Sequence, residues 1–442
     1  MNSKLDYYIP KIYNILIPML MFGVPIQAII PVFLNIPSNP INFGFRLSYA
    51  VLSLGLIVLA IVYTSSSYKN LSLAPTILIF LFFLYSIRLT YDVSIRHIKF
   101  DGGNDIMIYG YGFGNCFLPS ISIVLNRKRL NIEAIVKNIY IFIILVNVLV
   151  LSMILFQNNG FSANLFLQRV SVRGVESNLL LIHTILIGFY GAALVTSTYY
   201  VLSFGIDLKN KWLFYLLFLL GISNLILSAS RGPFFFTILL LTIITILRIL
   251  LNKTSVLSFL LGLLIGIVII TSFSTIIFSN LNDGVSFEDL TLVNRVLDFK
   301  ASRENKEKEE RDYEWESAIR QFKENPIIGD QFVTKYDGFE YYPHNIYIEF
   351  LMSLGLIGGI LYTFLIFFQI SNFFKLLKLK NKIGLFLYIY FILFFMHSSL
   401  SGCVFISADF WTIFTTSLVV FNTTFNKQNK NLSNPLIDRI QK

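Results

Sequence analysis

Charged side chains are scarce in this sequence. Asp, Glu, Lys and Arg make up only 14% of its 442 residues, whereas 55% are hydrophobic and 44 are phenylalanine. A chain of this composition is typical of polytopic membrane proteins rather than of soluble globular ones. Its apolar runs are continuous and do not alternate with polar residues, which argues against a transmembrane β-barrel. We therefore expect an all-α fold, a polytopic bundle of membrane helices.

Cysteine and histidine are also rare, with two and four residues. The two cysteines, Cys116 and Cys403, lie at or in apolar segments, which leaves a disulfide open with nothing to suggest one. No Cys/His cluster has the spacing of a metal site, and the sequence has no Asp-x-Asp motif. The sequence therefore predicts neither a metal nor another cofactor.

Twelve apolar runs are long enough to cross a bilayer, because a helical span needs about 20 residues. They comprise residues 15–34, 43–63, 71–89, 106–125, 135–156, 179–204, 212–227, 232–251, 256–278, 345–370, 383–400 and 404–421. The first run lacks a small-residue cleavage site, so it is predicted to be a span rather than a signal peptide. The fourth contains Gly110, Gly112, Gly114 and Pro119 and is expected to be kinked or broken near its middle.

The distribution of basic residues predicts the orientation. If the N-terminus is cytoplasmic, most Lys and Arg residues fall on inner segments, and the short outer loops carry only Arg96, Lys99, Arg169, Arg173 and Arg231. This asymmetry supports cytoplasmic termini and the count of twelve. The net charge of +10 is then a property of inner loops and does not indicate nucleic-acid binding. The chain divides into spans one to nine (1–278), an outer loop (279–343), spans ten to twelve (344–421) and a cytoplasmic tail (422–442).

The outer loop is the one sizeable polar segment. Within it, residues 305–325 are predicted to form an amphipathic helix that Pro326 and Gly329 end. Its apolar residues recur at helical spacing and are Trp315, Ala318, Ile319 and Phe322. We expect this stripe to dock on the membrane surface or on the bundle, with a solvated linker helix as the alternative.

A second polar motif, Ser-Ala-Ser-Arg-Gly-Pro at 228–233, follows the seventh span. Ser230 suits the position before a helix and Pro233 its first turn. A helix start directs backbone N–H groups and the positive end of its dipole at a ligand. With Arg231 and the hydroxyls of Ser228 and Ser230, this turn suits a phosphate or pyrophosphate. The alternative is an arginine that reaches for lipid headgroups. The loop after span five adds Arg169 and Arg173 to the same predicted face.

His344 follows Pro343 and starts the tenth predicted span. A histidine exchanges a proton near neutral pH, although a helix-start histidine without chemistry is the alternative. Glu349 is a carboxylate at shallow membrane depth, and we expect it to pair with an arginine because an unpaired one is costly there. Gly355 and the nearby Gly358 and Gly359 favour close helix packing rather than ligand contact.

Together these motifs resemble the O-antigen polymerase and O-antigen ligase superfamily of bacterial envelope proteins. The residues that carry the resemblance are Ser228-Ala-Ser-Arg231-Gly, Arg311, Trp315, Pro326-Ile-Ile-Gly329, His344-Asn345-Ile-Tyr347-Ile-Glu349, Gly355 and Gly358, and Arg173-Gly174 with Asn178 is similar to a further motif. They cover roughly the second half of the chain, and their order and shared outer location make the combination specific. Asp330 departs from the pattern, in which another glycine is common, and puts the local turn in question.

The resemblance implies a GT-C-type membrane glycosyltransferase at the outer face of the bacterial inner membrane. Its partners would be undecaprenyl-pyrophosphate-linked glycans as donor and acceptor, membrane lipids and a chain-length regulator protein. His344 would activate or orient the acceptor hydroxyl, Arg231 and Arg173 would hold the donor pyrophosphate, and Arg311 would sit at the site or fix the loop. Further substrate contacts are expected from Arg169, Ser228, Ser230, Asn345, Tyr347 and Glu349.

Three functions are compatible with these features. The leading one is a polymerase that moves the growing glycan onto a new lipid-linked repeat unit, by a metal-independent displacement that inverts the anomeric centre. A ligase, which moves the finished glycan to lipid A-core, shares the motifs, but the first half of the chain contains nothing that we match to a ligase. A lipid-linked glycan flippase or transporter is less consistent, because the notable charges gather at one surface rather than at mid-membrane.

Overall fold

Helices dominate the computed structural model, which describes residues 2–34, 36–63, 71–100, 104–160, 165, 168–173, 180–204, 211–252, 291, 310–336 and 339–420. Within these residues nine helices are long and apolar enough to cross a membrane, and two apolar helices are shorter, Trp212–Leu227 and Ala408–Val420. The predicted all-α polytopic membrane bundle is confirmed. The predicted ninth span, 256–278, and the predicted tail, 422–442, lie outside the described residues.

The chain forms two compact units, which we describe separately. Unit 1 comprises Met1–Met21, Asn42–Ile139 and Glu309–Lys442, and unit 2 comprises Phe22–Ile41 and Tyr140–Lys308. The boundaries fall inside α1 (Asn2–Leu34), α2 (Ser38–Tyr63) and α7 (Ile132–Gln157).

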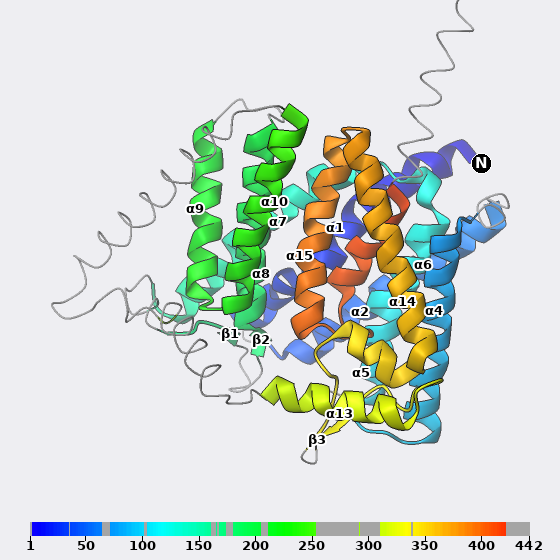
Figure 1. Cartoon of the computed structure of the whole chain (residues 1–442). Helices are drawn as coiled ribbons and strands as arrows, with labels where there is room; N and C mark the ends of the chain where they lie inside the picture. Colours follow the sequence, from blue (N-terminus) through cyan, green and yellow to red (C-terminus); the bar gives the residue numbers. More distant parts are fainter. Residues whose placement is uncertain are drawn as a thin grey trace, which may run out of the picture. The chain divides into compact units, whose positions relative to one another are not determined.

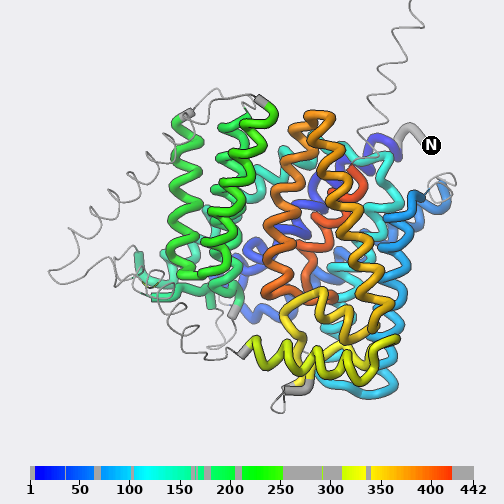
Figure 2. Tube along the Cα trace, viewed as in Figure 1, coloured from blue at the N-terminus to red at the C-terminus, as the bar shows by residue number. Residues whose placement is uncertain are grey.

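In unit 1, long helices run side by side (Figures 1 and 2). Besides its parts of α1, α2 and α7, the unit contains α4 (Leu73–Thr90) with a π-helical extension (Tyr91–Ile95), α5 (Asp105–Tyr109), a second π-helix (Gly110–Phe117), α6 (Leu118–Leu125), a short 3₁₀ turn (Arg127–Arg129), α14 (Ile346–Lys378), α15 (Lys382–Ser401) and the helix Ala408–Val420. The fourth predicted span therefore contains a π-helix where a kink or break was expected. Gly114 in this π-helix lies so close to α2 that an added Cβ would be 2.9 Å from the carbonyl oxygen of Arg46.

A break interrupts α14 at Gly355, whose φ is +63°. Residues 326–330, which we call the 326–330 turn, lie against this break. Leu356 N–H donates to the Pro326 carbonyl (2.8 Å), and Asp330 N–H donates to that of Met352 (2.8 Å). A Cβ at Gly355 would lie 2.4 Å from the carbonyl carbon of Ile327, so only glycine fits. Gly355 is closely packed, as expected, but against the 326–330 turn rather than against another helix.

Helix α13 (Glu310–Glu324) lies crosswise to the long helices at one end of unit 1, next to the hairpin of β3 (Thr334–Tyr336) and β4 (Phe339–Tyr341) (Figure 1). It contacts α14 and β3. Of its predicted apolar stripe, Ala318 is buried and Ile319 is exposed, while Trp315 and Phe322 are half-buried. The buried face also contains polar residues, namely Glu314, Ser317 and Gln321. Side-chain partners on the bundle, rather than apolar spacing alone, therefore set the orientation of α13.

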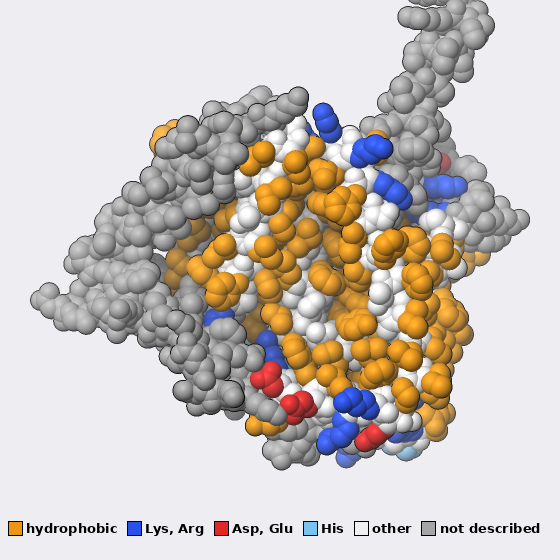
Figure 3. Space-filling model, viewed as in Figure 1, with side chains coloured by type: hydrophobic (Ala, Val, Ile, Leu, Met, Phe, Trp, Pro, Cys, Tyr) orange, Lys and Arg blue, Asp and Glu red, His pale blue; other side chains and the backbone are white. Residues whose placement is uncertain are grey.

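The outer side of α14 is a continuous apolar surface. Its exposed residues recur every three or four positions and include Leu356, Ile360, Phe364 and Phe367. Figure 3 shows hydrophobic side chains covering α14 and α15, with charged side chains gathered toward their ends. This is the pattern of helices that face lipid.

In unit 2, α8 (Thr184–Phe204) packs against both α9 (Lys211–Leu227) and α10 (Arg231–Asn252) (Figure 1). A buried hydrogen bond from Asn224 Nδ2 to Asn147 Oδ1 (2.8 Å) joins α9 to α7. The sixth predicted span, 179–204, begins with a strand rather than a helix. Here β2 (Leu180–Ile182) pairs antiparallel with β1 (Val172–Arg173), so strand pairing replaces the start of the predicted helix.

Candidate active site

His344 occupies a left-handed turn directly before α14. Its φ is +54°, a conformation that is uncommon for residues other than glycine but in which asparagine, aspartate and histidine are enriched. The next residue, Asn345, caps the helix, because its Oδ1 accepts from the N–H of Ile348 (3.1 Å). The Nδ2 of Asn345 donates to the carbonyl of Ser399 at the end of α15 (2.8 Å). The predicted start of this span is confirmed, and the cap also joins two helices of unit 1.

Glu314 of α13 is a charged group that lies beside His344. His344 Nε2 lies 3.8 Å from Glu314 Oε1, and both side chains are largely shielded from solvent. A carboxylate at this distance favours the protonated form of an imidazole, because opposite charges attract more strongly where water is excluded. The pair can therefore accept a proton and stabilise the resulting imidazolium.

Two further contacts hold α13 over this turn. Trp315 Nε1 donates to the carbonyl of Pro343, the residue before His344 (2.8 Å). Arg311 Nη2 donates to the Ser401 hydroxyl at the end of α15 (3.3 Å). Arg311 and Glu314 are one helical turn apart, so the same face of α13 is tied to α15 and presents the carboxylate to His344.

Aromatic side chains form one wall of the His344 turn. The Tyr342 ring lies 4.6 Å from the imidazole, and the Tyr341 ring lies 5.5 Å from it. The two tyrosines stack at 4.4 Å, and Phe100 stacks on Tyr341. Burial raises the pKa of Tyr342 well above its ordinary value, so its phenol stays neutral. His344 and Glu314 remain the groups suited to proton transfer in this cluster.

Among the residues that the structure describes, Glu349 contacts no arginine, contrary to the expectation from sequence. It is fully buried, and Tyr85 donates its hydroxyl hydrogen to Oε1. The N–H of Val404 donates to Oε2 (2.9 Å), and the Cys403 thiol lies 3.7 Å from Oε1. Neutral donors therefore satisfy this carboxyl group within the described part of unit 1. Tyr347, by contrast, is 43% exposed.

In unit 2, the Ser228–Arg231 turn connects α9 to α10. Arg231 is the first residue of α10, as the sequence predicts, and Ala229 has a φ of +45°. The Ser228 hydroxyl donates to the carbonyl of Leu225 (2.7 Å) and accepts from the N–H of Ser230 (3.2 Å). Both serines are buried, whereas Arg231 is half-buried. The Ser228 hydroxyl therefore closes the turn itself.

Arg169 and Arg173 lie in the segment around β1, and both are exposed. The N–H of Val170 donates to the carbonyl of Leu227, the last residue of α9 (3.3 Å). The backbone of Arg173 is held by the side chain of Gln157, which accepts its N–H (3.2 Å). This segment therefore adjoins the Ser228–Arg231 turn at the backbone level. Gly174 and Asn178 lie outside the described residues.

The predicted site residues thus form two groups. Unit 1 holds Arg311, His344, Asn345, Tyr347 and Glu349, and unit 2 holds Arg169, Arg173, Ser228, Ser230 and Arg231. In the part of the chain that the structure describes, no group of three or more His, Cys, Asp or Glu residues could hold a metal ion. Metal independence remains a prediction.

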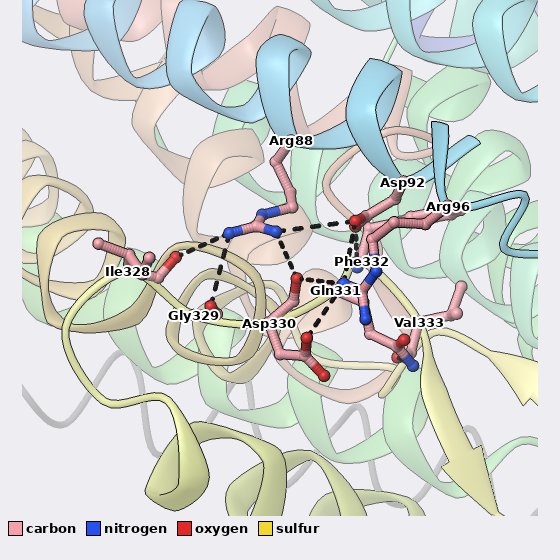
Figure 4. Close-up of polar contacts among 9 residues, drawn as sticks. All are labelled: Arg88, Asp92, Arg96, Ile328, Gly329, Asp330, Gln331, Phe332 and Val333. Atoms are coloured by element: carbon pink, nitrogen blue, oxygen red, sulfur yellow. Dashed lines mark hydrogen bonds and ion pairs between the residues drawn. The ribbon is translucent and has the colours of Figure 1, made fainter. Parts of the chain in front are cut away.

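The structure adds a cluster that was not anticipated, Arg88, Asp92 and Arg96 (Figure 4). Asp92 is fully buried, with Oδ1 3.7 Å from Arg88 Nη1 and 3.3 Å from Arg96 Nη1. Its Oδ2 accepts from the N–H of Phe332 (3.1 Å). The spacing of four residues, which places all three on one helical face, was the available signal.

This cluster holds the 326–330 turn. Arg96 Nη1 lies 3.0 Å from Asp330 Oδ1, so the aspartate that departs from the family pattern forms an ion pair. Glu314 was the other residue missed. It has no apolar character, and only the docking of α13 places it beside His344.

Residues 216–363 match the family described as O-antigen ligase. The matched region runs from α9 into α14 and contains Arg231, Arg311, His344 and Glu349. No curated protein matches the sequence. The matched family and the apolar helices support a multi-pass membrane protein that, over residues 216–363, is similar to the O-antigen polymerase and O-antigen ligase superfamily.

Proposed function

We propose that this protein polymerises O-antigen or related surface-polysaccharide repeat units. It transfers the growing glycan from undecaprenyl pyrophosphate to the sugar of a new lipid-linked repeat unit. The observation that carries the proposal is the His344–Glu314 pair at the start of α14, with 3.8 Å between Nε2 and Oε1. A polymerase must remove a proton from a sugar hydroxyl, and a histidine beside a carboxylate suits that task.

In the proposed reaction, the acceptor hydroxyl oxygen attacks the anomeric carbon of the donor glycan. The bond from that carbon to the pyrophosphate oxygen breaks, and undecaprenyl pyrophosphate leaves with the electron pair. The hydroxyl proton passes to His344, and Glu314 stabilises the imidazolium. A single displacement of this kind inverts the anomeric centre. Because pyrophosphate is already a good leaving group, the protein has only to neutralise its charge and remove the proton.

In unit 2, we assign the donor pyrophosphate to Arg231, with Arg173 and Arg169 as further cationic contacts. Arg231 starts α10, where backbone N–H groups and the helix dipole also favour an anion. In unit 1, we assign sugar contacts to Arg311, Asn345 and Tyr347. The whole site would face the periplasm, with both termini in the cytoplasm of a bacterial inner membrane.

The deciding experiment is reconstitution of the purified chain in lipid vesicles with defined undecaprenyl-pyrophosphate-linked repeat units. We expect a ladder of glycan lengths on a gel without added metal or protein partners. His344→Asn and Arg231→Ala should each abolish the ladder while the variants remain folded. A wild-type chain that yields no ladder, or a His344→Asn variant that yields a normal one, would contradict the proposal.

A ligase is the second candidate, because the matched family is described as O-antigen ligase. Such an enzyme would use the same donor and proton acceptor but transfer the finished glycan to lipid A-core. Adding a lipid A-core acceptor to the vesicles separates the two functions. In cells, loss of a polymerase leaves single repeat units on the surface, whereas loss of a ligase leaves none attached.

A further inference from the structure

The 326–330 turn lies alongside two candidate membrane spans, inside their ends. Arg88, which contacts the turn, is about 10 Å from the end of its span at Ile95, at about 1.5 Å per residue. On α14, the contacts at Met352 and Leu356 are about 9–15 Å from the start of the span at Ile346. Measured along each of the two helices, the turn therefore lies at a similar distance inside the helix end.

Protein donors reach four of the five backbone carbonyls of the turn, those of Pro326, Ile328, Gly329 and Asp330. The guanidinium of Arg88 donates to the carbonyls of Ile328 (3.1 Å), Gly329 (3.5 Å) and Asp330, as Figure 4 shows. The Pro326 carbonyl accepts from the N–H of Leu356 in α14, and the N–H of Asp330 donates to the carbonyl of Met352 in the same helix. A carbonyl without a donor costs several kcal/mol in hydrocarbon, whereas water would satisfy it at a surface turn.

Two side chains of the turn, those of Ile327 and Ile328, are exposed. Ile327 is 65% exposed and Ile328 is 62% exposed. The turn bonds to Leu356, which with Ile360 belongs to the exposed apolar side of α14. The two isoleucines thus extend a surface that already faces lipid.

We propose that the 326–330 turn is embedded in the membrane, with Ile327 and Ile328 packed against the acyl chains of the bilayer. Arg88 and Arg96 are the internal donors that make this depth tolerable for an irregular backbone. Because the turn directly follows α13, it anchors the end of that helix in the lipid. This inference concerns the membrane interface and holds whichever glycan reaction the protein performs.

The test is the accessibility of a nitroxide spin label at Ile328→Cys, in the full chain reconstituted in phosphatidylethanolamine and phosphatidylglycerol vesicles. Oxygen concentrates in lipid, and a nickel chelate stays in water. Ile360→Cys on α14 is the lipid control, and Glu324→Cys at the exposed end of α13 is the water control. The wild-type chain, whose Cys116 and Cys403 are both buried, gives the labelling background.

We expect the label at 328 to match the one at 360, with high oxygen and low nickel accessibility. Accessibility like that at 324 would place the turn in water and overturn the proposal. Low accessibility to both probes would mean that protein covers the turn. A loss of oxygen accessibility at 328 but not at 360 on adding undecaprenyl phosphate would assign the surface to the carrier chain. Each of these last two results would also overturn the proposal.

A second readout avoids the label. Ile328→Trp should be quenched by brominated lipid acyl chains as strongly as Ile360→Trp, against the background of the native tryptophans. Quenching no greater than the wild-type background would contradict a lipid-facing turn even if the labelled variant failed to fold.

Discussion

Two helix starts in this protein have a similar backbone conformation but are built differently. Both α10 and α14 follow a residue in the left-handed region, Ala229 (φ +45°) and His344 (φ +54°). At α10, the Ser228 hydroxyl bonds to the backbone of Leu225 and of Ser230, which lie within three residues of it. At α14, the contacts come from α13 and α15, at Glu314 and Ser399.

The difference shows which site depends on the tertiary fold. The Ser228–Arg231 turn carries its own hydrogen bonds, so the exposure of a helix start to an anion follows from local sequence. The His344 turn acquires its carboxylate only when α13 docks. Substitutions far from His344 should therefore affect proton transfer, whereas the turn in unit 2 should respond mainly to substitutions within it.

The largest effect is expected for His344→Asn. Asparagine tolerates a left-handed backbone, so the variant removes the imidazole with little strain. Loss of a general base should lower the initial rate of ladder formation by about 10²–10⁴-fold. His97→Asn is the matched control, because His97 is exposed and has a φ of +53°. A wild-type rate for His344→Asn would show that His344 takes no part in the reaction. The two turns would then no longer differ in their role in proton transfer.

Next in size is Gly355→Ala. The added Cβ would meet the Ile327 backbone at 2.4 Å and would sit at positive φ, so the 326–330 turn must leave the break in α14. We expect a loss of about 3 kcal/mol in the free energy of unfolding, seen as a lower thermal midpoint in detergent. Gly55→Ala on α2, where nothing lies within 4 Å, is the control and should leave the midpoint nearly unchanged. Equal midpoints for both variants would mean that the turn does not occupy the break.

A smaller effect is expected for Glu314→Gln, which keeps the shape of the side chain and removes the charge beside His344. The rate of polymerisation should fall by about tenfold, equivalent to about 1.4 kcal/mol of transition-state stabilisation. Glu324→Gln, at the exposed end of the same helix, should have no effect on the rate. If both variants had the same polymerisation rate, the docking of α13 would not contribute to the chemistry. The proposed dependence of the His344 turn on tertiary contacts would then be wrong.

The smallest effect is expected for Ser228→Ala. The variant loses two buried hydrogen bonds within the turn, which should cost about 1 kcal/mol of stability with polymerisation retained. Ser152→Ala, at an exposed position on α7, is the control for loss of a hydroxyl. Thermal midpoints and ladder rates measured together separate the cases. A large fall in rate with an unchanged midpoint would mean that Ser228 contacts substrate, as the sequence suggested.

Much of the fold could be predicted, because a helix in lipid satisfies its own backbone hydrogen bonds and local apolarity is then sufficient. The predicted run at 232–251 lies within α10, and the predicted loop helix corresponds to α13 where the chain is described. The run at 179–204 was partly wrong, because Leu180–Ile182 form β2, which pairs with β1. Apolar composition alone does not predict such strand pairing.

The candidate site was predictable only in part. His344 and Asn345 stand at the start of α14 as expected, since caps and turns are local. The partners of Glu349 were predicted incorrectly, because Tyr85 and Cys403 are distant in sequence and depend on how α4 and α15 pack. The ion pairs of Asp92 were missed for a related reason. Their spacing was visible, but their role in holding a distant turn was not.

By itself, the sequence determined that this chain is a membrane helix bundle with a polar loop, two polar helix starts and motifs that resemble one known superfamily. Those properties depend on residues that are neighbours along the chain. Only the tertiary structure decided that Glu314 faces His344, that neutral donors hold Glu349, and that the 326–330 turn fills the break in α14. Each of these requires segments far apart in sequence to meet, and buried polar groups then take whichever partners the packing brings within reach.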